Sequence, residues 1–202
     1  MSARILKAFS KHRLGGEPVP DDLAILLPHA TEVADRTGIG LNWQETWAPW
    51  LDTSYLSEAE RSNPDIAAAV RASAEVCSLI AFVARHEDGE CYGFWRGPKR
   101  RSISHSPLVY LDTEGSFRYS TGPTFAELLL GQTFGGREFA DLRKWLKSLG
   151  ISVRAKTADE LTYPQDDFNP GTLDYFLNDF FNRVKVTGGA AAVARIDGPT
   201  GV

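Results

Sequence analysis

Residues 79–131 constrain the fold more than any other part of the chain, because four short strand patterns there run directly into a helix pattern. The strand patterns cover residues 79–84, 91–95, 108–111 and 117–120. Asp88-Gly89 and Gly115 mark turns, and Gly93 within the second strand is typical of a backbone that another element approaches closely. Glycine turns leave no room for crossover helices, so the sequence predicts an antiparallel meander.

A helix is expected directly after the fourth strand. Thr124 and Glu127 have the spacing of a capping box, in which each side chain accepts a hydrogen bond from a free backbone N–H at the helix start. The apolar face that follows can lie on the sheet, and its residues are Phe125, Leu128 and Leu129.

This order of strands, turns and helix resembles the SUKH superfamily, which includes yeast cell-wall-assembly regulators and bacterial immunity proteins against polymorphic toxins. The resemblance rests on Ile80-Ala81-Phe82-Val83-Ala84, Asp88-Gly89, Tyr92-Gly93, Pro107-Leu108-Val109-Tyr110-Leu111-Asp112, Gly115 and Thr124-Phe125-Ala126-Glu127-Leu128-Leu129. It implies an α+β domain whose partner is a cognate toxin protein.

Helical patterns precede the meander. Asp21-Asp22 opens an apolar pattern that Pro28 interrupts before residues 30–36 resume it. Asn63-Pro64 is typical of an N-cap followed by proline at the first helical position. The helix that it opens carries one apolar face, made of Ile66, Val70, Ser73 and Cys77.

A second helical block follows the meander. Apolar residues at helical spacing end at Gly150, residues 151–154 could add a strand to the sheet edge, and Thr157 to Glu160 repeats the capping-box pattern. The most regular apolar stripe comes next, and either completes the core or forms a partner-binding surface. It consists of Leu173, Phe176, Leu177, Phe180, Phe181 and Val184.

The patterns together predict an α+β fold, with a mostly antiparallel sheet, helices packed on one side and a C-terminal helical extension. A single domain is expected over residues 1–186, with the best-matching core at 63–136 and the extension at 137–186. Residues 187–202 contain too few large apolar side chains to order them, so they are expected to form a flexible tail.

An aromatic cluster lies between the first helices and the meander. Trp43, Trp47, Trp50 and Tyr55 fall close together, and Pro49 interrupts any helix there. Large aromatic side chains dominate both protein cores and recognition surfaces. The cluster is therefore interpreted as core packing, with an exposed recognition surface as the alternative.

Composition excludes several classes of protein. The chain has 202 residues, enough for a substantial core without disulfides, and its two cysteines, Cys77 and Cys91, lie in apolar patterns that favour buried thiols. No apolar run is long enough to span a membrane or to act as a secretory signal, so a cytoplasmic protein is expected. The net charge is −4, and the acidic excess lies in the first 75 residues, which argues against nucleic-acid binding.

Catalytic and metal-binding motifs are not found. The histidines His12, His29, His86 and His105 have no ligand spacing among themselves or with the cysteines. No nucleophile elbow or phosphate-binding glycine loop occurs in strand-to-helix context. No catalytic residue, metal ligand or cofactor is therefore predicted, and the protein is not expected to be an enzyme.

Two groups of charged residues are candidates for partner binding. Arg100 and Arg101 belong to a basic loop between two strands, which could bind an acidic partner or be a solvated loop. The acidic candidates, Asp159, Glu160, Asp166 and Asp167, could meet the basic cleft of a toxin and speed association, or favour helix starts.

The sequence therefore favours a non-enzymatic protein-binding module, and the SUKH resemblance implies an immunity protein that occludes a toxin. A regulatory scaffold of the same superfamily is the alternative, followed by an enzyme with an unrecognised site. The oligomeric state does not follow from the sequence.

Overall fold

The structure is a computed structural model that describes residues 2–162 and 170–189, and within α8 the side chains from Leu177 onward. The helices are α1 (Ser2–Arg13), α2 (Asp21–Leu26), α3 (Ala30–Thr37), α4 (Glu58–Arg61), α5 (Pro64–Cys77), α6 (Phe125–Gly131), α7 (Gly136–Ser148) and α8 (Pro170–Thr187). The strands are β1 (Ile39–Leu41), β2 (Ile80–His86), β3 (Cys91–Trp95), β4 (Leu108–Leu111) and β5 (Phe117–Tyr119). Short 3-10 turns cover Leu27–His29, Pro49–Leu51, Ile103–His105 and Ala158–Glu160.

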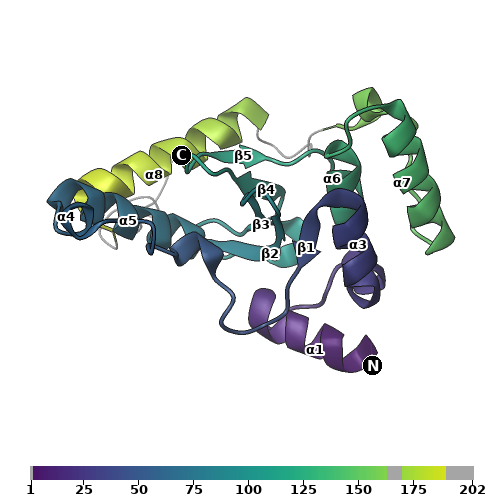
Figure 1. Cartoon of the computed structure of the whole chain (residues 1–202), viewed down its shortest axis with the longest axis horizontal. Coiled ribbons are helices and arrows are strands. Elements are labelled where there is room, and N and C mark those ends of the chain that lie inside the picture. The colour runs from purple at the N-terminus through teal and green to yellow at the C-terminus, as the bar shows by residue number, and fades with distance from the viewer. Residues whose placement is uncertain (1, 163–169, 190–202) are drawn as a thin grey trace, which may run out of the picture.

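The described strands form one sheet in the order β1-β2-β3-β4-β5, and each neighbouring pair is antiparallel. The predicted meander and the predicted α+β class are therefore confirmed (Figure 1). Strand β1 was not predicted; it adds to the free edge of β2 and pairs Ile39 with His86. Three residues are too few to show a strand periodicity.

Gly93 lies where the sequence analysis expected a close approach, and the approaching element is β2. A Cβ atom at this position would lie 2.7 Å from the Ala81 carbonyl oxygen and 2.8 Å from the Phe82 Cα. The register of β2 against β3 also shifts between Phe82 and Ala84. Glycine is therefore required by the packing of two backbones beside a bulge.

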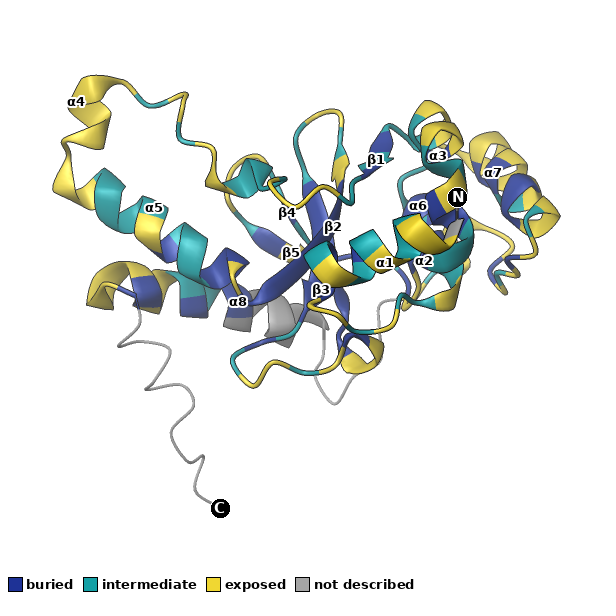
Figure 2. Ribbon diagram, turned by 90° about the horizontal axis from the view of Figure 1, so that it is seen from below, coloured by how far each residue is buried: buried dark blue, intermediate teal, exposed yellow. Residues whose placement is uncertain are grey.

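Helices cover both faces of the sheet, so the prediction that they pack on one side was wrong. Every residue of β3 is buried, as are the first five of β2 (Figure 2). Continuous burial of this kind occurs when both faces of a strand are covered. Successive residues alternate between two cores, with Phe94 in one and Trp95 in the other.

The first core lies under α1, α2, α3, α6 and α7. Phe9, Leu23, Val33, Leu128 and Leu146 are its fully buried representatives from these helices. The second core lies under α5 and α8 and contains Ala72, Val76, Leu177, Phe180 and Val184. Of the C-terminal stripe, Leu177, Phe180 and Val184 are thus core, and Phe181 is partly buried against that core. The side chains of Leu173 and Phe176 lie outside the described residues.

Several predicted helix ends agree with the structure. The Asn63 side chain accepts from the Asp65 N–H at 2.9 Å at the start of α5, and Thr124 Oγ1 accepts from the Glu127 N–H at 3.3 Å in α6. The capping box at Thr124 is incomplete, because the Glu127 carboxylate accepts from the Thr124 hydroxyl. Gly150 follows the end of α7 with φ of +90°.

Other boundaries differ from the prediction. Residues 151–154 form no strand, and their backbone is irregular. The segment is instead held by the side chains of Ile151 and Ala155, which are buried in the first core. Thr157 makes no side-chain cap hydrogen bond. Thr187, predicted to begin the tail, is the last residue of α8, and residues 190–202 lie outside the described residues.

Candidate functional site

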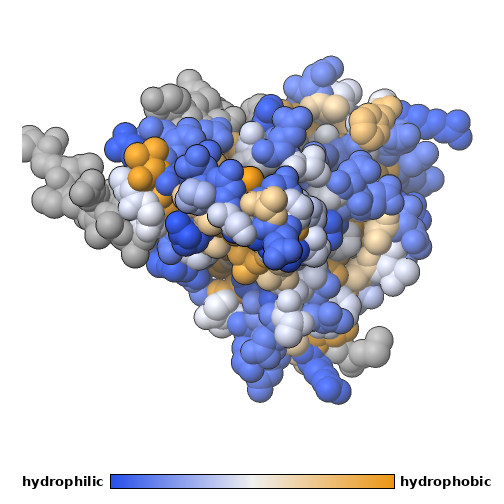
Figure 3. Space-filling view, turned by 60° about the vertical axis from the view of Figure 1, so that its left-hand side comes forward, coloured by the Kyte–Doolittle hydropathy of each residue, from blue (hydrophilic) through white to orange (hydrophobic). Residues whose placement is uncertain are grey.

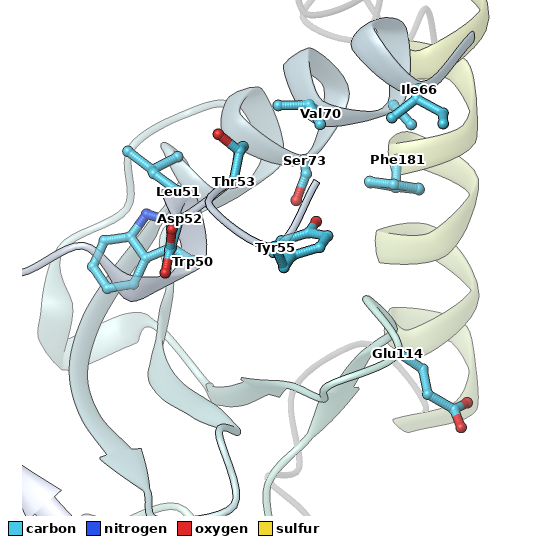
Figure 4. Close-up of a pocket in the computed structure, with 11 residues that line it drawn as sticks. Trp50, Leu51, Asp52, Thr53, Tyr55, Ile66, Val70, Ser73, Glu114 and Phe181 are labelled. Atoms are coloured by element: carbon cyan, nitrogen blue, oxygen red, sulfur yellow. The ribbon is translucent and has the colours of Figure 1, made fainter. Parts of the chain in front are cut away.

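A groove opens between residues 50–55 and the two helices α5 and α8, and the β4–β5 turn closes its lower rim (Figure 4). Its volume is about 300 Å³. The lining residues are Trp50, Leu51, Asp52, Thr53, Tyr55, Ile66, Ala69, Val70, Ser73, Glu114 and Phe181. Most of these side chains are apolar, which is typical of ligand-binding and partner-binding concavities.

The wall formed by α5 is an apolar helix face that is only partly covered. Ile66, Val70 and Ser73, which the sequence analysis placed on one face with Cys77, are half-buried and line the groove. Cys77 at the end of the same face is buried in the second core. The N-terminal half of α5 extends with α4 away from the sheet, so no strand covers it (Figure 1).

The opposite wall is formed by the aromatic cluster. Trp50 stacks on Phe82 of β2 with ring centroids 4.3 Å apart, and Trp47 meets Trp50 edge to face at 5.3 Å. Trp43 packs against the first core. The cluster thus combines both interpretations, since the tryptophans pack inward while Tyr55 is 75% exposed.

Arg13 at the end of α1 holds this wall in place. Its guanidinium donates to the carbonyl oxygens of Trp47 at 2.7 Å, Gln44 at 2.8 Å and Glu45 at 3.0 Å. The guanidinium carbon also lies 5.3 Å from the Trp47 ring centroid, a cation–π arrangement. Arg13 is only 9% exposed, so α1 fixes the backbone of the segment that carries Trp50.

Both charged residues that line the groove are acidic. The Asp52 Oδ1 atom accepts from the Ser54 N–H at 2.8 Å, which holds the carboxylate in an Asx turn. This bond lowers the pKa of Asp52, with smaller contributions from the Ser54 hydroxyl and the Arg85 charge. Glu114 lies at the opposite rim, on the β4–β5 turn, and its carboxylate points outward (Figure 4).

Hydrophobic side chains are visible on the molecular surface at this end of the protein. Figure 3 brings the end with α4 and α5 forward, and hydrophobic atoms appear near the centre of the view among hydrophilic ones. Leu51 and Tyr55 are 49% and 75% exposed, and the other large hydrophobic residues exposed to a comparable degree in the described chain are Phe134 and Val186. Two of these four side chains therefore lie at one groove.

The basic loop predicted to bind a partner is ordered by its own hydrogen bonds. Arg100, with φ of +50°, donates from Nη1 to the Ser78 carbonyl at 2.9 Å, just beyond α5. The Arg101 carbonyl accepts from Arg96 Nε at 2.8 Å. Glu17 binds Arg96 and also accepts from the Ile103 N–H at 2.7 Å. Arg100 thus has a structural role, and neither predicted arginine lines the groove.

The acidic candidates are also not part of the groove. Asp159 and Glu160 form an exposed 3-10 turn after α7, where Glu160 Oε2 accepts from the Lys156 N–H at 2.8 Å. Asp166 and Asp167 lie outside the described residues. The structure therefore does not bring the described acidic and basic candidates together at one site.

The thiols and histidines of the described chain form no reactive cluster. Cys77 and Cys91 are buried and unbridged, as predicted, and burial raises their pKa to about 12 and about 11. Each histidine has a different neighbour; His86 Nδ1, for example, lies 3.2 Å from Asp88 Oδ2 within its own turn. In residues 2–162 and 170–189 no three His, Cys, Asp or Glu side chains converge to hold a metal ion.

A second hollow lies between the N-termini of α2 and α6. It is about 340 Å³ in volume and is lined in part by Asp22, Ser104 and Phe125. Asp22 Oδ2 accepts from the Ala126 N–H at 2.9 Å, and Oδ1 accepts from the Leu23 N–H at 2.9 Å. The carboxylate therefore caps two helices, and this structural role accounts for its position.

The groove was not predicted, although part of its signal was present in the sequence. Pro49 ends any helix beside Trp50, and an aromatic segment that cannot be helical is a candidate for exposure.

Within the described chain no helix has the length and apolar character needed to cross a bilayer. No protein-family model matches this sequence, and comparisons with curated proteins and with solved structures gave no match.

Proposed function

We propose that this protein is a non-enzymatic protein-binding module of the cytoplasm, and specifically an immunity protein that sequesters a cognate toxin by covering its active site. The resemblance of residues 79–131 to the SUKH superfamily supports the immunity role. The groove between residues 50–55, α5 and α8 supports protein binding, and we refer to it as the aromatic groove.

The observation that carries the proposal is the exposure of apolar side chains around one concavity. Tyr55 and Leu51 form one rim, and the half-buried Ile66 and Val70 form the wall opposite. Exposed apolar side chains that gather at one place mark interaction sites on soluble proteins, whereas scattered ones do not. Tyrosine and tryptophan are also the side chains that most often anchor protein interfaces.

The rigidity of the groove wall suits tight inhibition. The Arg13 hydrogen bonds and the stacking of Trp50 on Phe82 order the wall before any partner arrives. A surface ordered in advance loses less conformational entropy on binding, which favours affinity. An inhibitor that acts by occlusion needs such affinity, typically with Kd near the nanomolar range or below.

Co-expression with the product of the adjacent gene tests the proposal. The immunity role predicts rescue of growth and a complex that survives gel filtration. Tyr55→Ser should weaken the complex, whereas Phe134→Ser removes an even more exposed aromatic ring from a distant turn and should not. A complex without growth rescue would favour the regulatory scaffold, and failure to bind the neighbouring gene product would contradict the immunity role.

A further inference from the structure

The aromatic groove has a charge pattern that defines the chemistry of its partner. Of the eleven side chains that line it, seven are apolar or aromatic, and the two carboxylates are those of Asp52 and Glu114. No lysine, arginine or histidine belongs to the lining. The groove therefore combines a mostly apolar and aromatic lining with one acidic residue at each of two rims.

We infer that the aromatic groove binds a protein segment in which an apolar or aromatic side chain is flanked by lysine or arginine. This inference rests on the proposed function, because it assumes that the groove is the partner-binding surface. The apolar side chain would enter between Tyr55 and Phe181, and the cations would lie toward Asp52 and Glu114.

The apolar part of this recognition follows from the position of the aromatic rings. Phe181 is half-buried on α8, and its ring lies 6.1 Å from that of Phe117, centroid to centroid, so the sheet supports it from behind. Val70 faces the same opening from α5 (Figure 4). An entering side chain would thus contact fixed walls, as anchor side chains do at the centre of interfaces.

The charged part follows from the fixed carboxylate of Asp52. The Ser54 N–H orients this group and lowers its pKa, so it is ionised at neutral pH. The Arg85 charge also lowers the pKa of Asp52, by less than the Ser54 hydrogen bonds do. Opposite charge at the rim of an interface mainly raises the association rate and selects against acidic partners.

Peptide titration of the full-length, isotope-labelled protein tests the inference without the natural partner. The probes are three hexapeptides: a central Leu-Phe pair flanked by two lysines on each side, the same pair flanked by glutamates, and a Gly-Ser pair flanked by lysines. At peptide concentrations on the order of 1 mM, the first should shift the amide resonances of residues 50–55 and 66–73. The second and third should shift them much less.

Matched variants separate charge from shape. Asp52→Asn with Glu114→Gln should weaken binding of the lysine-flanked Leu-Phe peptide about fivefold at low salt, because each exposed ion pair contributes little. Asp35→Asn with Asp141→Asn makes the same change of charge on α3 and α7, which cover the other face of the sheet, and should leave affinity unchanged. Tyr55→Ser should weaken binding, and Phe134→Ser should not.

Equal binding of the glutamate-flanked peptide, or no shift in the groove with any peptide, would overturn the inference. So would equal loss of affinity in the two charge-changed double variants. The neighbouring gene product distinguishes this failure from failure of the proposed function. If that complex forms and Asp52→Asn with Glu114→Gln does not weaken it, the proposed function stands and only the inferred chemistry of the partner segment is refuted.

Discussion

Replacement of Arg13 by methionine is the sharpest test of how the aromatic groove is built. Methionine keeps much of the length of the side chain but removes the hydrogen bonds to the carbonyls of Gln44, Glu45 and Trp47. We expect a loss of global stability together with loss of order in residues 44–51. Both follow because the Arg13 guanidinium donates three hydrogen bonds from α1 to this segment.

The magnitude follows from the burial and the charge of the guanidinium. A hydrogen bond from a charged donor contributes about 1.5–3 kcal/mol when one partner is removed. The contributions do not add, because a single guanidinium makes all three hydrogen bonds. The accepting residues Gln44 and Glu45 are exposed, so water can replace part of what is lost. The expected decrease in the free energy of unfolding is about 2–4 kcal/mol.

Urea unfolding of Arg13→Met and of Arg4→Met measures this difference. Arg4 is exposed on the same helix, so its replacement controls for lost charge and should change stability by about 0.5 kcal/mol or less. Arg13→Lys keeps the charge but lacks the planar fork and should recover only part of the loss. A decrease below about 1 kcal/mol for Arg13→Met would refute the proposed clamp.

Three further predictions concern the sheet and its cores. Phe180→Ala should lower the free energy of unfolding, measured in urea, by about 3–5 kcal/mol, because Phe180 is 1% exposed. Val186→Ala should be nearly neutral, because Val186 is 85% exposed. A neutral Phe180→Ala would contradict its place in the core. Gly93→Ala should cost about 1–3 kcal/mol or more by overpacking against β2, and an unchanged melting temperature would be inconsistent with that contact. Burial raises the pKa of Cys77 to about 12 and of Cys91 to about 11, against about 8.5 when unfolded. Between about pH 8.5 and pH 11 only the unfolded chain loses these protons, so the free energy of unfolding should fall over this range. The native thiols should also resist a disulfide reagent at pH 8. Rapid labelling of the folded protein would contradict their burial.

Local chemistry accounts for what could be predicted from the sequence. Glycine turns at Gly89 and Gly115 act over a few residues, as do the caps at Asn63 and Thr124, so each is readable without knowledge of distant neighbours. The meander and the helix that follows it depend only on such signals. For the same reason their order along the chain was predicted correctly.

Long-range contacts account for what could not be predicted. The pairing of β1 with β2 and the coverage of both faces of the sheet depend on segments far apart in the sequence. The bonds from Arg13 to Gln44 and Trp47 span more than thirty residues, with separations of 31 and 34, and no local pattern marks them. Those bonds and the stacking of Trp50 on Phe82 place Trp50 opposite α5, so the aromatic groove also depends on long-range contacts.

Hydrogen exchange with and without the neighbouring gene product tests the central claim most directly. If the aromatic groove binds the partner, amides of residues 50–55 and 66–73 should exchange about tenfold more slowly in the complex. The distant loop at Phe134 should exchange at the same rate in both samples. Protection confined to other surfaces, with the groove unchanged, would contradict the claim that this groove is the binding site.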